Sequence, residues 1–63
     1  MNKIREIREA KKISQKELSG KAKVSRPYLC DLENNRRGAK PETLERIALA
    51  LGVNVNDLIQ KAV

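Results

Sequence analysis

Histidine, tryptophan and phenylalanine are absent from this 63-residue chain, and cysteine and tyrosine each occur once. Without histidine the chain lacks the commonest metal ligand and the usual general base. Cys30 alone cannot form an internal disulfide or a zinc cage. Gly20, Gly38 and Gly52 are isolated, so the sequence has no glycine-rich phosphate loop. We therefore expect no enzymatic activity, no metal site and no cofactor.

A long hydrophobic run is also missing from the start of the sequence, where charged residues alternate with isoleucine through the first twelve residues. This pattern predicts neither a signal peptide nor a membrane span. The single cysteine gives no indication of an oxidising compartment. We expect a cytoplasmic protein without a membrane partner.

Positive charge is abundant but unevenly distributed. The net charge is +6, and the pI is about 9.9. Residues 1–40 carry twelve Lys and Arg against five Asp and Glu, whereas residues 41–63 carry two against three. A basic part beside a near-neutral part is typical of a protein with one side facing a polyanion. A generally basic surface with no such partner is the alternative.

The length is that of one small domain, residues 1–63, with no room for an enclosed substrate cleft. Apolar residues at helical spacing, together with capping residues, predict five short helices and no strand. The predicted helices cover residues 2 to about 12, 15 to about 22, 26–33, 41–51 and 55 to about 61. Asn2 is the predicted N-cap of the first helix, and Gly52 is the predicted C-terminal cap of the fourth.

Two N-caps lie close together in residues 14–34. Ser14 precedes Glu17 by three residues, which is the spacing of a reciprocal capping box, and Ser25 caps the next helix. Because only two residues separate the end of the first of these helices from Ser25, the two helices must cross steeply. This arrangement predicts a helix-turn-helix, the unit that places its second helix in a DNA major groove.

The faces of these two helices differ in character. The inner faces are apolar, with Leu18, Ala22, Val24, Leu29 and Leu32. The outer face of the second helix is left for solvent or a partner, with Arg26, Pro27, Cys30, Asp31 and Asn34.

The loop that follows is strongly basic. Arg36, Arg37 and Lys40 are three cations within five residues, with no acid between Glu33 and Glu42. Next to a helix N-terminus, such a loop is able to hold phosphate. The alternative is an ordinary solvated loop.

In combination, the motifs resemble the phage-repressor-like (Cro/cI-type) helix-turn-helix family over about residues 4–60. They are SQ-x-EL from Ser14, VS at Val24, LE at Leu32, P-x-x-L from Pro41 and IA-x-ALGV from Ile47. The resemblance implies an all-α, compact five-helix lambda-repressor-like domain with the helix-turn-helix at the second and third helices. It also implies a sequence-specific regulator of transcription that binds double-stranded DNA. Such a protein is expected to be a repressor that binds a palindromic operator as a homodimer.

The resemblance and, for Arg36, Arg37 and Lys40, the basic composition of the loop assign contacts to residues. The expected base-reading residues are Ser25, Arg26, Pro27, Cys30 and Asp31. The expected phosphate contacts are Gln15, Tyr28, Asn34, Arg36, Arg37 and Lys40.

Several of these assignments have alternatives. Arg26 bonds either a guanine O6/N7 pair or a phosphate, and Pro27 offers apolar contact to a thymine methyl. Asp31 accepts from cytosine N4, repels wrong bases, or is merely a surface charge. Tyr28 either seals the helix edge or bonds phosphate. Cys30 is either a tolerated small residue or a redox sensor.

The alternative for Gln15 is that it is an ordinary polar residue at the start of its helix.

The family also suggests two structural features. It pairs an arginine of the first helix with the glutamate that ends the third, and here these are Arg8 and Glu33. It commonly has glycine where Lys23 stands, so Lys23 is expected to adopt a positive φ.

Two other functions remain open from the sequence. One is an antitoxin-type module that masks a protein partner and also binds its own operator. The other is a nucleic-acid chaperone without sequence preference, although one aromatic residue argues against base stacking. With the sequence reaching Val63 and no sensor domain apparent, we expect weak dimerisation through residues 51–58, or dimerisation on DNA.

Overall fold

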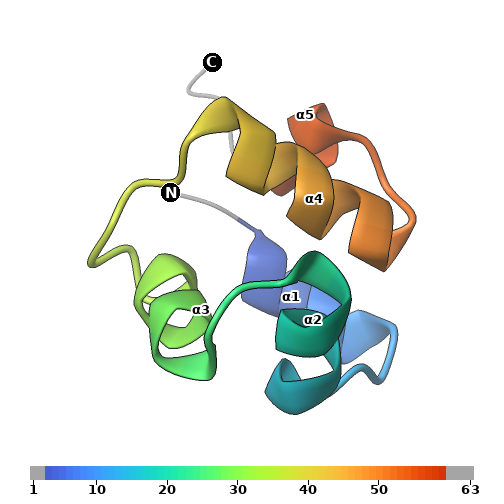
Figure 1. Ribbon diagram of the computed structural model, residues 1–63. Helices are drawn as coiled ribbons and strands as arrows, with labels where there is room; N and C mark the ends of the chain where they lie inside the picture. The colour runs from blue at the N-terminus through green and yellow to red at the C-terminus, as the bar shows by residue number, and fades with distance from the viewer. Residues whose placement is uncertain (1–2, 60–63) are drawn as a thin grey trace.

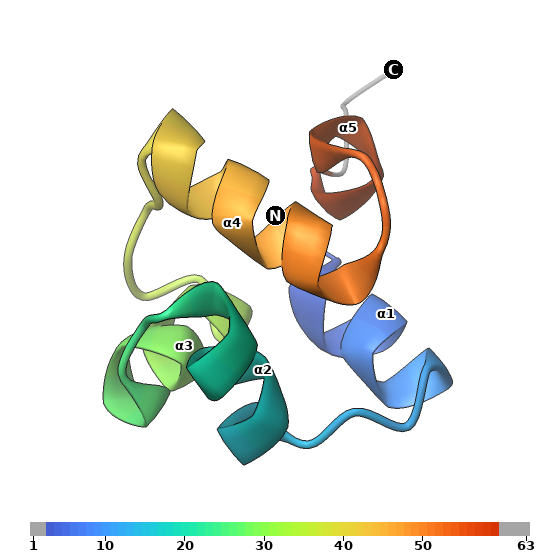
Figure 2. The ribbon, with the colours of Figure 1, turned by 45° about the vertical axis from the view of Figure 1, so that its right-hand side comes forward.

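The computed structural model describes residues 3–59, and this part of the chain contains five α-helices and no strand (Figure 1). The helices are α1 (Ile4–Ala10), α2 (Gln15–Ala22), α3 (Arg26–Glu33), α4 (Pro41–Leu51) and α5 (Val55–Leu58). In both ribbon views α4 and α5 lie together above α2 and α3 (Figures 1 and 2). The predicted all-α class and the number of helices are confirmed. None of these helices has the length and apolar character needed to cross a membrane.

One apolar core draws on all five helices. Its buried members are Ile4, Leu18, Ala22, Leu29, Leu32, Ile47, Ala48, Leu51 and Leu58. Leu18, Leu29, Ile47 and Leu58 have no exposed surface at all. Each fully buried side chain of this size contributes about 1.5–3 kcal/mol to the free energy of unfolding, relative to the same side chain left exposed. The inner positions of the helix-turn-helix therefore fix α2 and α3 against the rest of the domain.

The turn between α2 and α3 forms for local reasons. Ser14 Oγ accepts a hydrogen bond from the Glu17 N–H at 3.0 Å, and Ser25 Oγ accepts one from the Tyr28 N–H at 3.2 Å. Lys23 ends α2 in the left-handed region, at φ 59° and ψ 44°. The predicted N-cap positions of Ser14 and Ser25 and the predicted positive φ are confirmed. The reciprocal capping box predicted at Ser14 forms only in part, because the Glu17 carboxylate pairs with Lys21 Nζ at 3.3 Å, one helical turn along, while Ser14 accepts from the Glu17 N–H.

Helix α1 is shorter than the sequence predicted. It begins at Ile4, with Lys3 at the N-cap position, and it ends at Ala10. The predicted cap, Asn2, lies outside the described residues. The helix stops before residue 12 because Lys12 has a φ of 58°, which turns the chain towards α2.

Helix α5 is also shorter than predicted, because it ends at Leu58 and Ile59 is extended at φ −103° and ψ 123°. The Leu58 carbonyl accepts a hydrogen bond from the Lys3 N–H at 2.7 Å, so the helix end is tied to the start of α1. Residues 60 and 61, which we expected in this helix, lie outside the described part. The capping box of Asn54 and Asp57 is present at the helix start.

Candidate nucleic-acid interface

The outer face of α3 is the first component of the candidate interface. Arg26 and Pro27 are exposed, and Cys30 and Asp31 are half-buried. On the opposite side, Leu29 and Leu32 are buried in the core, so the orientation of the helix about its axis is fixed. In the ribbon views α3 lies at the periphery of the molecule (Figures 1 and 2). The base-reading residues selected from this helix therefore share one accessible face.

Two other residues of this segment have mainly structural contacts. The Ser25 hydroxyl accepts from the Tyr28 N–H as the helix cap. The Tyr28 side chain is half-buried and packs against the core, which agrees with a role in sealing the helix edge. Its contact with phosphate stays a prediction.

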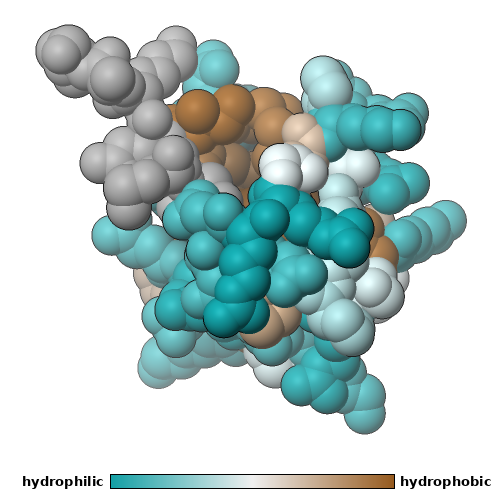
Figure 3. Space-filling model, turned by 90° about the vertical axis from the view of Figure 1, so that its left-hand side faces the viewer, coloured by the Kyte–Doolittle hydropathy of each residue, from teal (hydrophilic) through white to brown (hydrophobic). Residues whose placement is uncertain are grey.

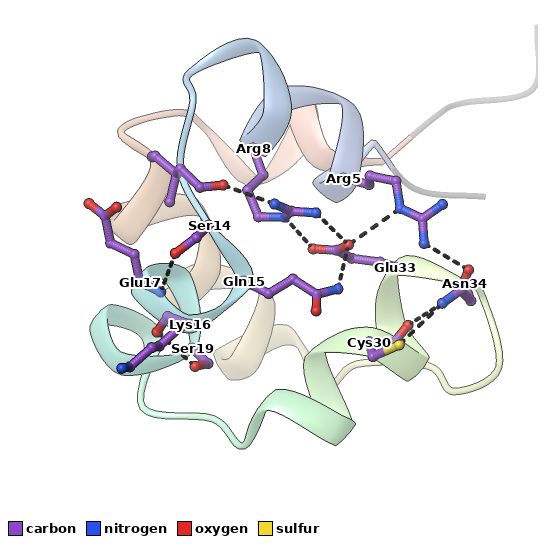
Figure 4. Close-up of polar contacts among 11 residues, drawn as sticks. Arg5, Arg8, Ser14, Gln15, Lys16, Glu17, Ser19, Cys30, Glu33 and Asn34 are labelled. Carbon is purple, nitrogen blue, oxygen red and sulfur yellow. Dashed lines mark hydrogen bonds and ion pairs between the residues drawn. The ribbon is translucent and has the colours of Figure 1, made fainter.

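Glu33, at the end of α3, is the centre of a buried polar cluster (Figure 4). Arg8 Nε lies 2.7 Å from Glu33 Oε2, and Arg8 Nη2 lies 3.1 Å from Oε1. The second terminal nitrogen of Arg8 donates to the Ile13 carbonyl at 2.9 Å. The Glu33 side chain is fully buried and that of Arg8 is 11% exposed. The ion pair inferred from the family is thus present, with bidentate geometry, and it joins α1 to α3.

The electrostatics of the cluster favour the charged forms. Burial on its own raises the pKa of Glu33, but hydrogen bonds from Arg8, Gln15 and Arg5 and the charge of Arg8 lower that pKa below its ordinary value. The hydrogen bond to Glu33 raises the pKa of Arg8. No buried side-chain nitrogen or oxygen within residues 3–59 lacks a hydrogen-bond partner. The cluster is therefore a fully satisfied, charged network.

Gln15 and Asn34, both selected as phosphate contacts, take part in this network. Gln15 Nε2 donates to Glu33 Oε1 at 3.1 Å. Asn34 Oδ1 accepts from Arg5 Nη2 at 2.9 Å, and Asn34 Nδ2 donates to the Cys30 carbonyl at 2.8 Å. A primary amide has two N–H donors and a carbonyl oxygen, so Gln15 retains capacity for a further partner. Contacts of either side chain with DNA stay predictions.

Arg5 was not selected from the sequence. Its Nε lies 3.4 Å from Glu33 Oε1, and its Nη2 bonds Asn34, so it links α1 to the end of α3. The available signal was its position three residues before Arg8, which places both arginines on one face of α1.

The basic loop after α3 is the second component. Asn35 has a φ of 59°, and the Arg36 N–H donates to the Asp31 carbonyl at 2.8 Å, so the loop starts back along α3. Arg36 Nη1 lies 3.8 Å from Asp31 Oδ1, and Arg37 Nε lies 3.5 Å from Asp31 Oδ2. Lys40 is exposed at the N-cap position of α4. The structure thus brings two of the three loop cations beside the outer face of α3.

The face that carries this loop is mostly hydrophilic, and its largest apolar area lies towards the upper edge of the view (Figure 3). Cys30 has a free thiol, and its Sγ accepts a weak hydrogen bond from Asn34 Nδ2 at 3.4 Å. The candidate interface as a whole combines a peripheral helix, a basic loop and the buried polar cluster around Glu33 at the end of α3.

Comparison with known proteins places this arrangement in a family. The sequence profile described as "Helix-turn-helix domain" matches residues 1–62. The chain belongs to the helix-turn-helix domain family. Its resemblance to Cro/cI-type proteins, predicted from the motifs, is confirmed by a phage relative.

Two curated relatives and one solved structure show how this helix-turn-helix domain compares. It is 39% identical over 57 residues to the HTH-type transcriptional regulator DdrOP3 of Deinococcus deserti, covering 90% of this chain and 44% of that protein. It is 41% identical over 56 residues to the immunity repressor protein of Bacillus phage phi105, covering 89% and 39% respectively. The domain thus spans less than half the length of either relative.

The crystal structure of the restriction-modification controller protein C.AhdI from Aeromonas hydrophila has the same fold. The TM-score is 0.87 at 28% sequence identity, and the match covers 90% of this chain and 86% of that one. The compact five-helix, lambda-repressor-like architecture expected from the sequence is therefore confirmed.

Proposed function

We propose that this helix-turn-helix domain is a sequence-specific transcriptional regulator that binds double-stranded DNA, that it acts as a repressor, and that it reads the major groove with α3. The proposal rests on the outer face of α3, where Arg26 and Pro27 are exposed while Leu29 and Leu32 hold the opposite face in the core. A helix held in this way enters a groove without rearrangement of the fold. Two relatives are a transcriptional regulator and an immunity repressor, which supports the same role.

Base recognition falls to the first turns of α3. Arg26 bonds guanine O6 and N7, a contact worth about 1–3 kcal/mol of discrimination. Pro27 contacts a thymine methyl group, and Asp31, one turn further along, accepts from a base amino group. Ser25 and Cys30 border the same surface.

Phosphate contacts flank this helix and set its depth and register. Gln15 acts from the first turn of α2, where the backbone N–H groups at a helix N-terminus also favour an anion. Tyr28 and Asn34 act from α3 and its end. Arg36, Arg37 and Lys40 act from the loop that precedes α4.

A homodimer on a palindromic operator fits this arrangement. Two copies related by a two-fold axis place their α3 helices about 34 Å apart, one turn of DNA. Leu49 is 83% exposed and Ile59 is 39% exposed, and both lie away from α3 in sequence, on α4 and directly after α5. They are the large apolar side chains that are exposed within residues 3–59, and the proposed dimer places them at the interface with the second copy.

Selection of binding sites from random duplexes, followed by titration at two salt concentrations, tests the proposal. We expect a palindromic consensus with half-sites one helical turn apart and at least about a thousandfold preference over random DNA. Arg26→Ala should lower affinity for the selected duplex by about 5- to 150-fold and relax the preference at one base pair per half-site. Glu45→Ala, an exposed change on α4, is the control. Equal affinity for selected and random duplexes would refute the proposal.

The exposed Leu49 also favours a second candidate, an antitoxin-type module that masks a protein partner through α4. In that case the chain should purify in a complex with a second polypeptide, and Leu49→Lys should release that polypeptide. A chain that purifies alone and self-associates through the same residue would favour the homodimer.

A further inference from the structure

Asp31 lies on the outer face of α3 and is also within reach of both loop arginines. Its carboxylate oxygens lie 3.8 Å from Arg36 Nη1 and 3.5 Å from Arg37 Nε. The Arg36 N–H also bonds the Asp31 carbonyl at 2.8 Å, so the backbone itself keeps the loop beside this residue. The pairing is therefore built into the loop geometry and does not depend on the reach of flexible side chains alone.

A carboxylate and a DNA phosphate offer a guanidinium the same kind of anionic oxygen acceptor. The Arg36 and Arg37 side chains are 69% and 65% exposed, while that of Asp31 is 32% exposed. Because exposed ion pairs are weak, a phosphate is able to replace Asp31. Once that happens, the carboxylate is left unpaired on a surface that faces other phosphates.

We propose that Asp31 is a specificity-determining residue that holds Arg36 and Arg37 in place of phosphate and releases them only where the DNA offers its carboxylate a base amino donor. On random duplexes the arginines either stay with Asp31 or leave it unpaired, so affinity is reduced. On the operator, cytosine N4 or another base amino group donates a hydrogen bond to Asp31 and so replaces the arginines as its partner. The inference rests on the proposed function and adds a penalty against non-specific DNA to the attractive contacts of α3.

Asp31→Asn tests this, with Glu45→Gln as the matched control. Both changes remove one negative charge with little change in shape, but Glu45 is an exposed residue of α4 and is not an ion-pair partner of Arg36 or Arg37. Relative to the change seen with Glu45→Gln, Asp31→Asn should raise affinity for random duplexes about two- to fivefold. It should also steepen the slope of log K against log salt by about 1–2, as one or two arginines gain phosphates. Affinity for the selected operator should not rise, so the specificity ratio falls.

A second background checks the route. When Arg36→Gln and Arg37→Gln are both present, adding Asp31→Asn should no longer steepen the salt slope, because neither loop arginine is left to gain a phosphate, and the gain on random duplexes should be smaller than in the wild-type background. A persistent steepening or an undiminished gain there would overturn the inference, as would an equal gain on random DNA and operator or a gain no larger than that of Glu45→Gln. Each of these failures leaves the wild-type chain preferring its operator, whereas failure of the proposed function would show as no preference in the wild type itself.

Discussion

Replacing Glu33 by alanine should destabilise this domain more than any change on its surface. The substitution removes the carboxylate that accepts hydrogen bonds from Arg5, Arg8 and Gln15. Arg8 then keeps its bond to the Ile13 carbonyl but remains a charged, 11% exposed side chain without a counter-ion. Loss of one partner of a buried ion pair costs about 3–5 kcal/mol. A domain of this length has a total stability of about 3–9 kcal/mol, so Glu33→Ala should lose a large share of it and, at the low end of that range, should be unfolded at 25 °C.

Urea and thermal unfolding followed by far-UV circular dichroism measure this loss. Glu17→Ala is the control, because Glu17 is 48% exposed and pairs with Lys21 on the surface, and it should cost under about 1 kcal/mol. The double variant Arg8→Met with Glu33→Leu removes both charges and should recover much of the stability, since a well-packed apolar pair often matches a buried ion pair. A loss under 1 kcal/mol in Glu33→Ala would refute the reasoning.

Three further outcomes follow from the same structure. Lys23→Gly should stabilise the fold by a few tenths to about 1 kcal/mol, because Lys23 has a φ of 59°, which glycine adopts without strain. A lower melting temperature would contradict the turn geometry. As a control, Lys21→Gly, inside α2, should destabilise the fold by about 0.5–1 kcal/mol. Because the pKa of Glu33 is lowered in the folded state, its contribution to stability is present above the ordinary glutamate pKa and is lost as the pH falls through the lowered value. Melts between pH 6 and about pH 3 should show this acid loss in the wild type and a smaller one in Glu33→Gln, and equal pH profiles would contradict it. Arg37→Gln should reduce the salt slope of operator binding by about 1 and weaken operator binding more than binding to random duplexes, where Asp31 holds Arg37. A changed consensus would contradict its assignment to phosphate.

The parts of the fold that depend on neighbouring residues were predictable from the sequence. Ser14 and Ser25 cap α2 and α3 through backbone groups three residues away, and these bonds are present. The positive φ of Lys23 follows from the two-residue turn and the resemblance. The apolar spacing of α4 and its Gly52 cap, at φ 73°, were likewise local signals.

The remaining features depend on contacts between distant residues, or on loop geometry that composition does not encode. Arg5 and Gln15 reach Glu33 from other helices, so their partners became visible only in the folded chain. The pairing of Asp31 with the loop arginines requires the left-handed Asn35, which nothing in the sequence pattern singled out. For the same reason Asp31 was considered as a base reader or a surface charge, and its contact with the loop was missed.

The hydrogen bond between the Lys3 N–H and the Leu58 carbonyl has a consequence for synthesis in the cell. It joins the first and nearly the last of the described residues, and the Leu58 side chain also completes the core. While this segment is still inside the ribosomal exit tunnel, the emerged helices lack both the anchor of α1 and one wall of the interior. We therefore expect the domain to reach its stable form late and in a nearly all-or-none step, once Leu58 is free, and nascent chains stalled before that residue should be digested by added protease.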